Sequence, residues 1–363
     1  AWQAAGFSCY GDAYGIKQGA AQTFLQDAVA HGARILKNVE IQRIVIKNGE
    51  VAGAECMFKP CHSERSEESG SGANPDANLG FLASLGMTEK GGGQLLPLKI
   101  KSKKVVLAAG ALHSPTLLLK SGLTHPHIGR NLYLHPVAAT GSFHNMDILP
   151  WYGPMMSVIV KEFERLDGNW GVRIECPPVH PGLAAFALSW ENGETFKQDM
   201  ANIRNLAVQI VLTRDKFGGR VTVGKRSGQP VIHYEISDYD KKNLLRGLQE
   251  SVRLHHASGS ERISVMHNEP MHFHPGGKKN LENFLTEMTQ KRWGNNWSTL
   301  FSAHQMGTCR MGGGKDYPVK PNGETREVRN LFVADGSLFP SASGANPMLS
   351  IQALAYWIAR QMR

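Results

Sequence analysis

The feature that most constrains the fold is a short apolar run near the end of the chain, which a turn separates from a helix-like stretch. Leu331 to Ala334 are consecutively apolar, as in a buried parallel strand, and Asp335-Gly336 ends the run. Pro347 stands where the first turn of a helix tolerates a missing N–H. Apolar residues then recur at helical spacing: Met348, Ile351, Ala355, Ile358 and Met362. We predict a strand, a turn and a helix whose N-terminal N–H groups suit an electron-rich part of a cofactor.

The high net charge excludes few classes of partner. The chain has 363 residues, enough for two domains, and a net charge of +9 with a pI near 9.3. Its Lys and Arg residues are scattered and lack an accompanying aromatic platform, so we expect no nucleic-acid partner. Attraction to an anionic membrane surface is compatible with this charge, so peripheral membrane association stays open.

Cysteine usage and hydropathy indicate the compartment. The five cysteines are odd in number and have no CxxC spacing, which argues against a disulfide framework and a zinc site. The histidines between positions 255 and 274 lack an HExxH pattern or carboxylate partners at ligand spacing, so we expect no metal. No apolar run approaches the roughly 18 residues of a membrane span, and the first residues lack a signal pattern. We expect a cytoplasmic protein, and association with a membrane surface stays open as an alternative.

The first hundred residues predict a helix followed by a small sheet. Gln18 to His31 has helical periodicity, with Phe24, Leu25, Ala28 and Val29 on one face, and Gly32 follows as a C-terminal cap. Residues 33–37 and 39–46 are predicted strands, and Asn48-Gly49 is a hairpin turn before a returning strand. Residues 59–97 are polar and rich in Gly, Ser and Asn, which favours a low-complexity insertion whose flanking strands join without it.

The middle of the chain predicts two further units. Leu98 to Leu107 is a predicted strand that enters a small-residue turn and then a helix with Pro115 in its first turn. This arrangement suits close approach of the backbone to a dinucleotide. From about residue 139 to 297, aromatic residues and Met are frequent, residues 220–236 form a hairpin pattern, and Ser237-Asp238 caps a helix. This second part is typical of an antiparallel sheet with a covering helix.

Two motifs in a fixed order resemble a known family. Residues 302–312 read SAHQMGTCRMG, and residues 332–348 read FVADGSLFPSASGANPM. Together they are similar to the C-terminal signature of the glucose-methanol-choline (GMC) family of flavoproteins, which oxidise alcohols. Their wording is most similar to the long-chain fatty alcohol oxidase branch. Residues 110–123, GALHSPTLLLKSGL, also resemble the second signature of the family.

The resemblance implies FAD as cofactor and a role for each matching residue. Alcohol oxidation delivers the α-hydrogen as hydride, which no side chain accepts, so a cofactor has to accept it. The resemblance makes His304 the base for the hydroxyl proton, or the group that stabilises the alkoxide, and Asn346 the second contact to the substrate oxygen. For His135 we weigh an approach to the flavin edge against simple packing and favour packing. The cofactor contacts that the resemblance implies are Ile41 at the adenine, Ala109, Gly110 and Ser114, Asp335 and Gly336 at the ribityl–pyrophosphate region, and Pro347 and Met348 at the pyrimidine ring.

The predicted architecture is an α/β chain, α+β overall, with an incomplete Rossmann-like domain. We expect residues 1–58, 98–138 and 298–363 to form an FAD-binding domain with a β-meander, and residues 139–297 to form a substrate-binding domain on an antiparallel sheet. No GxGxxG fingerprint occurs in the sequence, so we expect an N-terminally truncated fragment. The predicted substrate is a primary, long-chain alcohol, oxidised to an aldehyde, and the electron acceptor is oxygen or a quinone or cytochrome. The alternatives are a GMC dehydrogenase for another alcohol or a sugar, and an inactive remnant that cannot hold FAD.

Overall fold

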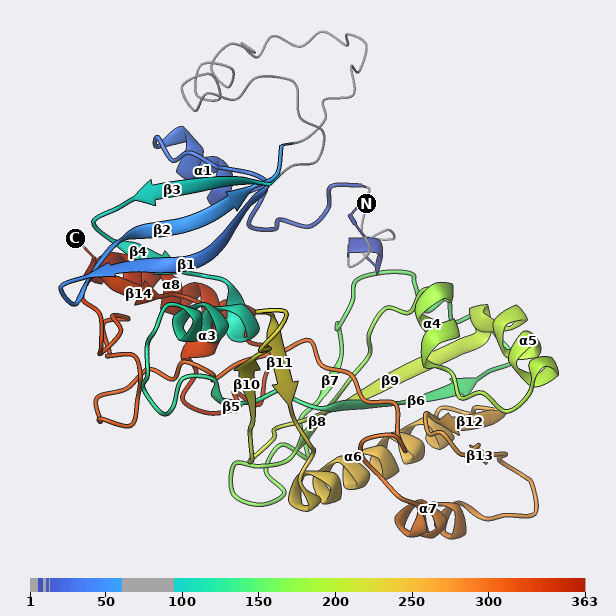
Figure 1. Cartoon of the computed structure of the whole chain (residues 1–363). Helices are drawn as coiled ribbons and strands as arrows, with labels where there is room; N and C mark the ends of the chain where they lie inside the picture. The colour runs from blue at the N-terminus through green and yellow to red at the C-terminus, as the bar shows by residue number, and fades with distance from the viewer. Residues whose placement is uncertain (1–5, 9–10, 13, 61–94, 363) are drawn as a thin grey trace, which may run out of the picture.

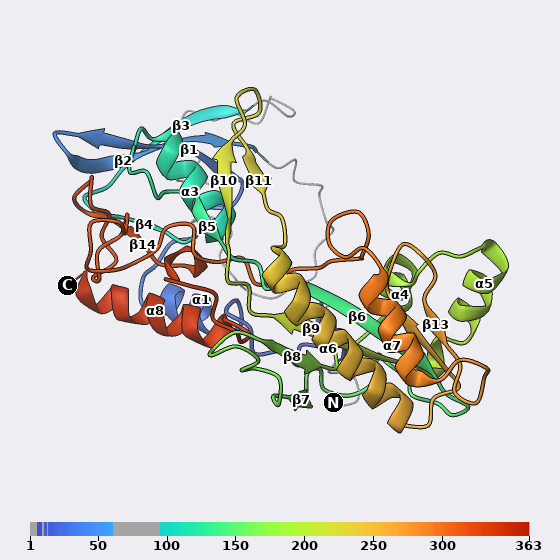
Figure 2. The same ribbon diagram turned by 90° about the horizontal axis from the view of Figure 1, so that it is seen from below.

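The computed structural model describes residues 6–8, 11–12, 14–60 and 95–362. Within these residues the strands form four sheets, and Figure 1 shows them in two groups. One group lies around helices α3 (Gly110–Lys120) and α8 (Met348–Gln361), and the other is a six-stranded sheet covered by helix α6 (Asp238–Ala257). Figure 2 shows the same division from below. The mixture of helices and sheets confirms the predicted fold class.

A three-stranded antiparallel meander is the first sheet along the described chain. Its strands are β1 (Val39–Lys47), β2 (Glu50–Phe58) and β3 (Leu96–Lys101), paired in that order. Asn48 and Gly49 adopt left-handed φ angles of 51° and 74°, which confirms the predicted hairpin turn. Phe58 pairs directly with Leu96, so the strands that flank the predicted insertion do join. Residues 61–94 of that insertion lie outside the described residues.

Three predicted boundaries in this part are wrong. Helix α1 spans only Phe24–Ala30, because residues 19–23 form turns in which Thr23 donates to the Gly19 carbonyl. Residues 33–37 do not form a strand, since an apolar stretch becomes one only where a neighbouring strand pairs with it. The predicted strand 98–107 is divided into β3 and β4 (Val105–Leu107), which belong to different sheets.

The apolar run near the C-terminus forms the predicted buried parallel strand. Strand β14 (Leu331–Val333) is fully buried and pairs in parallel with β4. Pro115 is the sixth residue of α3 rather than part of its first turn, so the predicted position is wrong. Because Pro115 has no N–H, the Ala111 carbonyl loses its helical donor, and the Thr308 hydroxyl donates to it instead, at 2.6 Å. This contact anchors the 302–312 loop on α3.

Helix α8 begins where predicted but is less buried than its pattern indicated. Met348 is its first residue and Pro347 its cap, and a short 3-10 turn, η3 (Gly336–Leu338), precedes them. Of the five residues on the predicted apolar face, only Ile358 is buried, and Met348 is 58% exposed. The periodicity therefore predicted the helix correctly, but it overestimated how much of the helix is buried.

The larger sheet is antiparallel throughout. Its order is β13-β12-β6-β9-β8-β7. The strands are β6 (Val137–Phe143), β7 (Ile159–Val160), β8 (Val172–Glu175), β9 (Leu206–Thr213), β12 (Arg262–Val265) and β13 (His272–Phe273). Helices α4 (Pro181–Ala187) and α5 (Gly193–Ala201), with the short η2 (Ile203–Asn205), lie at its far end (Figure 1). The predicted hairpin is also present: β10 (Gly219–Val223) pairs with β11 (Pro230–His233), and β5 (Arg130–Leu132) adds to β10.

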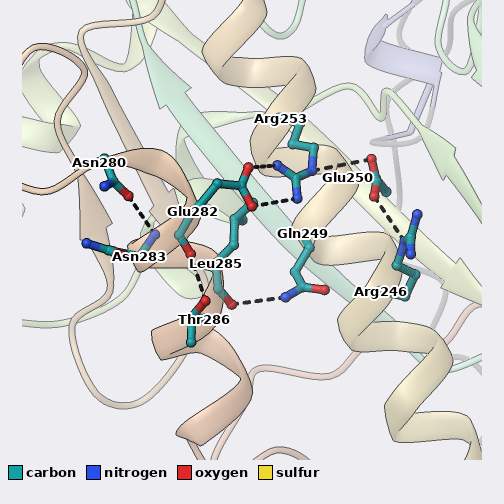
Figure 3. Close-up of polar contacts among 9 residues, drawn as sticks. All are labelled: Arg246, Gln249, Glu250, Arg253, Asn280, Glu282, Asn283, Leu285 and Thr286. Carbon is teal, nitrogen blue, oxygen red and sulfur yellow. Dashed lines mark hydrogen bonds and ion pairs between the residues drawn. The ribbon is translucent and has the colours of Figure 1, made fainter.

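Helix α6 packs against this sheet and against helix α7 (Leu281–Gln290). Ser237 caps α6 by accepting a hydrogen bond from the Asp240 N–H, as predicted, and Leu244, Leu248 and Val252 are buried. On the outer side, Gln249 donates to the Leu285 carbonyl at 2.9 Å and Arg253 pairs with Glu282, as Figure 3 shows. Several polar contacts thus tie the two helices together at their exposed side.

Candidate active site

A backbone bridge positions the His304 loop. The N–H groups of Tyr133 and Met306 donate to each other's carbonyls, at 2.9 and 3.0 Å, and the Ser302 hydroxyl donates to the Leu134 carbonyl at 2.5 Å. Gly307 has a φ of 90°, and a Cβ there would lie 2.4 Å from the Asn131 carbonyl oxygen. Only glycine allows the loop to approach residues 131–135 this closely.

His135 lies at the centre of the site, although the sequence favoured simple packing for it. Its Nδ1 is 3.2 Å from the Nδ1 of His304, and the two rings meet edge to face at 5.3 Å. Its Nε2 accepts a hydrogen bond from the Gly344 N–H at 2.9 Å. The fully buried His135 ring therefore joins the His304 loop to the segment that leads into α8.

Burial keeps both imidazoles neutral at neutral pH. Desolvation lowers the pKa of His304 below its usual value near 6.5. The pKa of His135 falls to about 3, mainly through burial, and further because a charge on His135 would be repelled by His304 whenever that ring is protonated, and by Arg214 and Arg173. A neutral imidazole can donate one hydrogen bond and accept one, so the pair can form an ordered chain.

A buried carboxylate holds the backbone beneath His135. Asp215 accepts from the N–H groups of Leu134 and His135, at 2.9 and 3.2 Å, and from the Tyr234 hydroxyl at 3.1 Å. Burial raises the pKa of Asp215 to about 6, although these donors act in the opposite direction. His135 has a left-handed φ of 48°, which costs energy for a residue other than glycine, and Asp215 bonds that backbone in place. No sequence motif pointed to Asp215.

In the part of the chain that the structure describes, no hydrogen bond joins Asn346 to His304. The Asn346 side chain is exposed, and its Nδ2 donates to the Oε2 of the buried Glu175 at 3.3 Å. Glu175 ends β8 and was not predicted. Among the described residues, the polar link between the two predicted catalytic residues is indirect: His135 bonds His304 on one side and Gly344, two residues before Asn346, on the other.

Five of the predicted cofactor residues meet around one carboxylate. Asp335 accepts from the Gly110 N–H at 2.9 Å, the Ser114 hydroxyl at 2.5 Å and the Ser337 N–H at 2.8 Å. Ser114 in turn accepts from the Ala109 N–H at 3.2 Å, and the Gly336 carbonyl accepts from the Gly307 N–H at 3.1 Å. The Asp335 side chain thus joins two motifs 221 positions apart, and Gly336 joins them to the His304 loop.

The other three predicted cofactor residues lie apart from this cluster. Ile41 is in β1, an edge strand of the meander, beside a register irregularity, and is 41% exposed. Pro347 and Met348 form the N-terminus of α8. Among the described residues, no hydrogen bond connects these three to the Asp335 side chain.

The turn between β4 and α3 is open to solvent. Ala108 and Ala109 are exposed, and a Cβ added at Gly110 would meet no atom within 4 Å. Open space over a glycine at a helix N-terminus allows a ligand to approach the backbone closely. The described residues contain no group of three His, Cys, Asp or Glu side chains placed to hold a metal ion. Nor do they contain a helix with the length and apolar character to cross a bilayer.

Comparison with known proteins defines the class of this chain. The C-terminal model of the GMC oxidoreductase family matches residues 216–355, and its N-terminal model matches residues 2–69 and 84–137. The chain therefore belongs to the GMC oxidoreductase family, which confirms the family that the motifs indicated.

The chain is also similar to individual proteins of this family. The long-chain-alcohol oxidase FAO3 of Arabidopsis thaliana is 33% identical over 98% of this chain and 46% of its own length. FAO4A of the same plant is 36% identical over 71% of this chain and 37% of its own. The chain thus spans about half the length of the curated relatives it matches. The crystal structure of pyridoxine 4-oxidase from Mesorbium loti has a TM-score of 0.63 at 19% identity, covering 94% of this chain and 61% of that one, which shows a shared fold.

Proposed function

We propose that this chain contributes to FAD-dependent oxidation of a primary, long-chain alcohol to an aldehyde. The observation that carries the proposal is the position of His304. Its loop bonds to Gly336 on the predicted cofactor side and to Tyr133, in the segment that leads from β5 to β6 of the larger sheet. A neutral imidazole at the junction of a cofactor site and a substrate domain suits a reaction at a hydroxyl group.

The residues of this chain would have different roles in the reaction. FAD, when bound, supplies the hydride acceptor. The exposed Ala108–Gly110 turn and the cluster around Asp335 would hold it through backbone groups, and the N-terminus of α8 favours negative charge on its ring. His304 would contact the substrate oxygen, either as the acceptor of the hydroxyl proton or as a donor that stabilises the alkoxide. Asn346, bonded to Glu175, would orient the substrate through its carboxamide.

The substrate class rests on the relatives. Both of the plant relatives described above are long-chain-alcohol oxidases by name. The aromatic and Met residues of the larger sheet's region are compatible with an apolar substrate but do not require one. Oxygen, or a quinone or cytochrome, would reoxidise the flavin.

The test is reduction of flavin in the absence of oxygen. The purified chain is incubated with FAD, separated from free cofactor and examined for visible flavin absorbance. Addition of a long-chain primary alcohol should then bleach the flavin bands, and a hexose should not. Retention of FAD with bleaching by the sugar alone would replace the proposed substrate class. Failure to retain FAD would reject the proposal for this chain.

A further inference from the structure

The geometry points to His135 as the residue that fixes His304 in the tautomer with its proton on Nε2, so that His304 meets the substrate oxygen as a hydrogen-bond donor. This inference deepens the proposed function and rests on it, because it takes His304 to face an alcohol substrate. The tautomer itself can be measured whether or not the chain turns over an alcohol. In this reading His135 is a positioning residue, because it acts through His304.

The backbone of Gly344 determines where His135 carries its proton. A backbone N–H can only donate, so the Nε2 of His135, at 2.9 Å from the Gly344 nitrogen, has to accept. A neutral imidazole has one proton, and the fully buried ring of His135 is neutral because its pKa is about 3. The proton of His135 is therefore on Nδ1.

The same reasoning then determines the proton of His304. The Nδ1 of His135 lies 3.2 Å from the Nδ1 of His304, and since the first carries a proton, the second has to accept it. The single proton of a neutral His304 is then on Nε2, the nitrogen that faces away from His135. The opposite assignment would place an Nε2–H of His135 against the Gly344 N–H. Turning the His135 ring over would replace both nitrogen contacts by carbon atoms.

The surrounding structure holds the His135 ring in this orientation. Asp215 accepts from the Leu134 and His135 N–H groups, and Ser302, two residues before His304, donates to the Leu134 carbonyl. The left-handed backbone at His135 is thereby bonded from both sides. The charged or titratable groups that act on this ring are His304, Arg214 and Arg173, with Asp215 on its backbone.

This arrangement decides between the two roles left open for His304. Acceptance of a proton on Nε2 would require the ring to begin with its proton on Nδ1, directly against the Nδ1–H of His135. A doubly protonated His304 would make the same clash of two donors. A neutral His304 with Nε2–H meets neither obstacle: it stabilises the oxygen that gains negative charge, and the hydroxyl proton passes to water instead of to His304.

The experiment uses nitrogen-15 NMR of histidine-labelled full-length chain, with His304 assigned by its loss in His304→Ala. We expect the wild-type spectrum to show a neutral His304 protonated on Nε2, with a pKa below the ordinary value. Two variants separate the two contacts of His135. In His135→Asn the amide nitrogen takes the place of Nδ1 and keeps the donor to His304, and Asn tolerates the left-handed φ. In His135→Gln the amide oxygen takes the place of Nε2 and keeps only the contact with Gly344.

We expect His135→Asn to retain the Nε2–H form of His304, and His135→Gln to give a mixture of tautomers with the His304 pKa raised by about one unit. Circular dichroism checks the fold of each variant. A wild-type His304 protonated on Nδ1 would overturn the inference, even if neither variant folds. So would a folded His135→Gln with an unchanged tautomer and pKa. Neither result depends on FAD, so a failure of the proposed function would be seen separately, in the flavin experiment.

Discussion

Helix α6 of one group and helices α1 and α8 of the other differ in how much of their surface is buried. In the group around the six-stranded sheet, α6 has eight buried residues among its 20, and its apolar side chains pack on the sheet and on α7. In the group around the meander, α8 has one buried residue among its 14 and α1 has none. Large apolar side chains of these two helices are exposed: Phe24, Leu25, Val29, Met348, Leu349, Tyr356 and Trp357.

This difference shows how the site is supported. His135 lies two residues before β6, and Asp215 lies two residues after the neighbouring strand β9, so the group around the six-stranded sheet fixes the imidazole pair. Most of the predicted cofactor residues lie in the group that contains α1 and α8, where α3 and the parallel strands β4 and β14 pack in a core of their own. The imidazole pair is thus held more firmly than α8, one of the elements expected to receive the cofactor.

The largest expected effect comes from changing His304, whose loop lies between the two groups. His304→Ala should lower the rate of anaerobic flavin reduction by roughly 10²–10³, the usual loss for one donor to a developing oxyanion. His304→Gln should lose less, because its amide N–H can replace the imidazole Nε2–H. His113→Ala is the control, since His113 is exposed on α3 and has no role in the proposal. Equal losses in the alanine and glutamine variants would favour the base role instead.

Matched leucine substitutions test the comparison of the two groups directly. Leu248 on α6 is fully buried and Leu349 on α8 is 72% exposed. Leu248→Ala should lower the free energy of unfolding by about 2–5 kcal/mol because it leaves a cavity. Leu349→Ala should change it by no more than about 0.5 kcal/mol. Urea unfolding of both variants measures the difference, and a comparable loss in Leu349→Ala would show that α8 is buried in solution.

Acid should destabilise the well-packed group through a buried histidine. His255 of α6 bonds Ser142 and Thr140, and burial lowers its pKa to about 4. The unfolded chain, with a pKa near 6.5, binds more protons between these values, so stability falls as the pH drops from about 6.5 to 4. The difference corresponds to at most about 3 kcal/mol. His135 acts in the same direction, whereas the raised pKa of Asp215 opposes it between about 4 and 6.

Unfolding free energies of the wild type and His255→Gln at several pH values check this prediction. The variant should lose less stability on acidification than the wild type. Parallel curves for the two proteins would mean that His255 is not buried as a neutral group.

The sequence predicted the local units and missed the contacts between them. The strand at 331–333, the Asn48-Gly49 turn and the Ser237 cap follow from residues within a few positions of each other, and each is confirmed. The role of His135 depends on His304, 169 positions away, and on a backbone N–H at Gly344. No local pattern specifies such partners, so the pattern around His135 indicated only packing.

The same limit explains why the burial of helices was overestimated. The apolar spacing of α8 and α1 correctly indicates faces that a helix can bury, but whether a face is covered depends on other elements. The Asn346 carboxamide is a similar case. The motif identified the residue, and only the structure shows that it bonds Glu175 and not the His304 ring.

The smallest expected effect concerns local opening of the two groups. Amide hydrogens of α1 and α8 should exchange faster than those of α6, because elements with little burial open with a smaller free energy. Adding FAD should slow exchange in the first turn of α8 and in the β4–α3 turn, since a ligand that binds only the folded form stabilises the elements it contacts. Exchange in α6 should remain unchanged, because its stability comes from the sheet and α7. Equal protection of α6 and α8 without FAD would remove the contrast, and protection of α6 alone on adding FAD would place the cofactor on the other group.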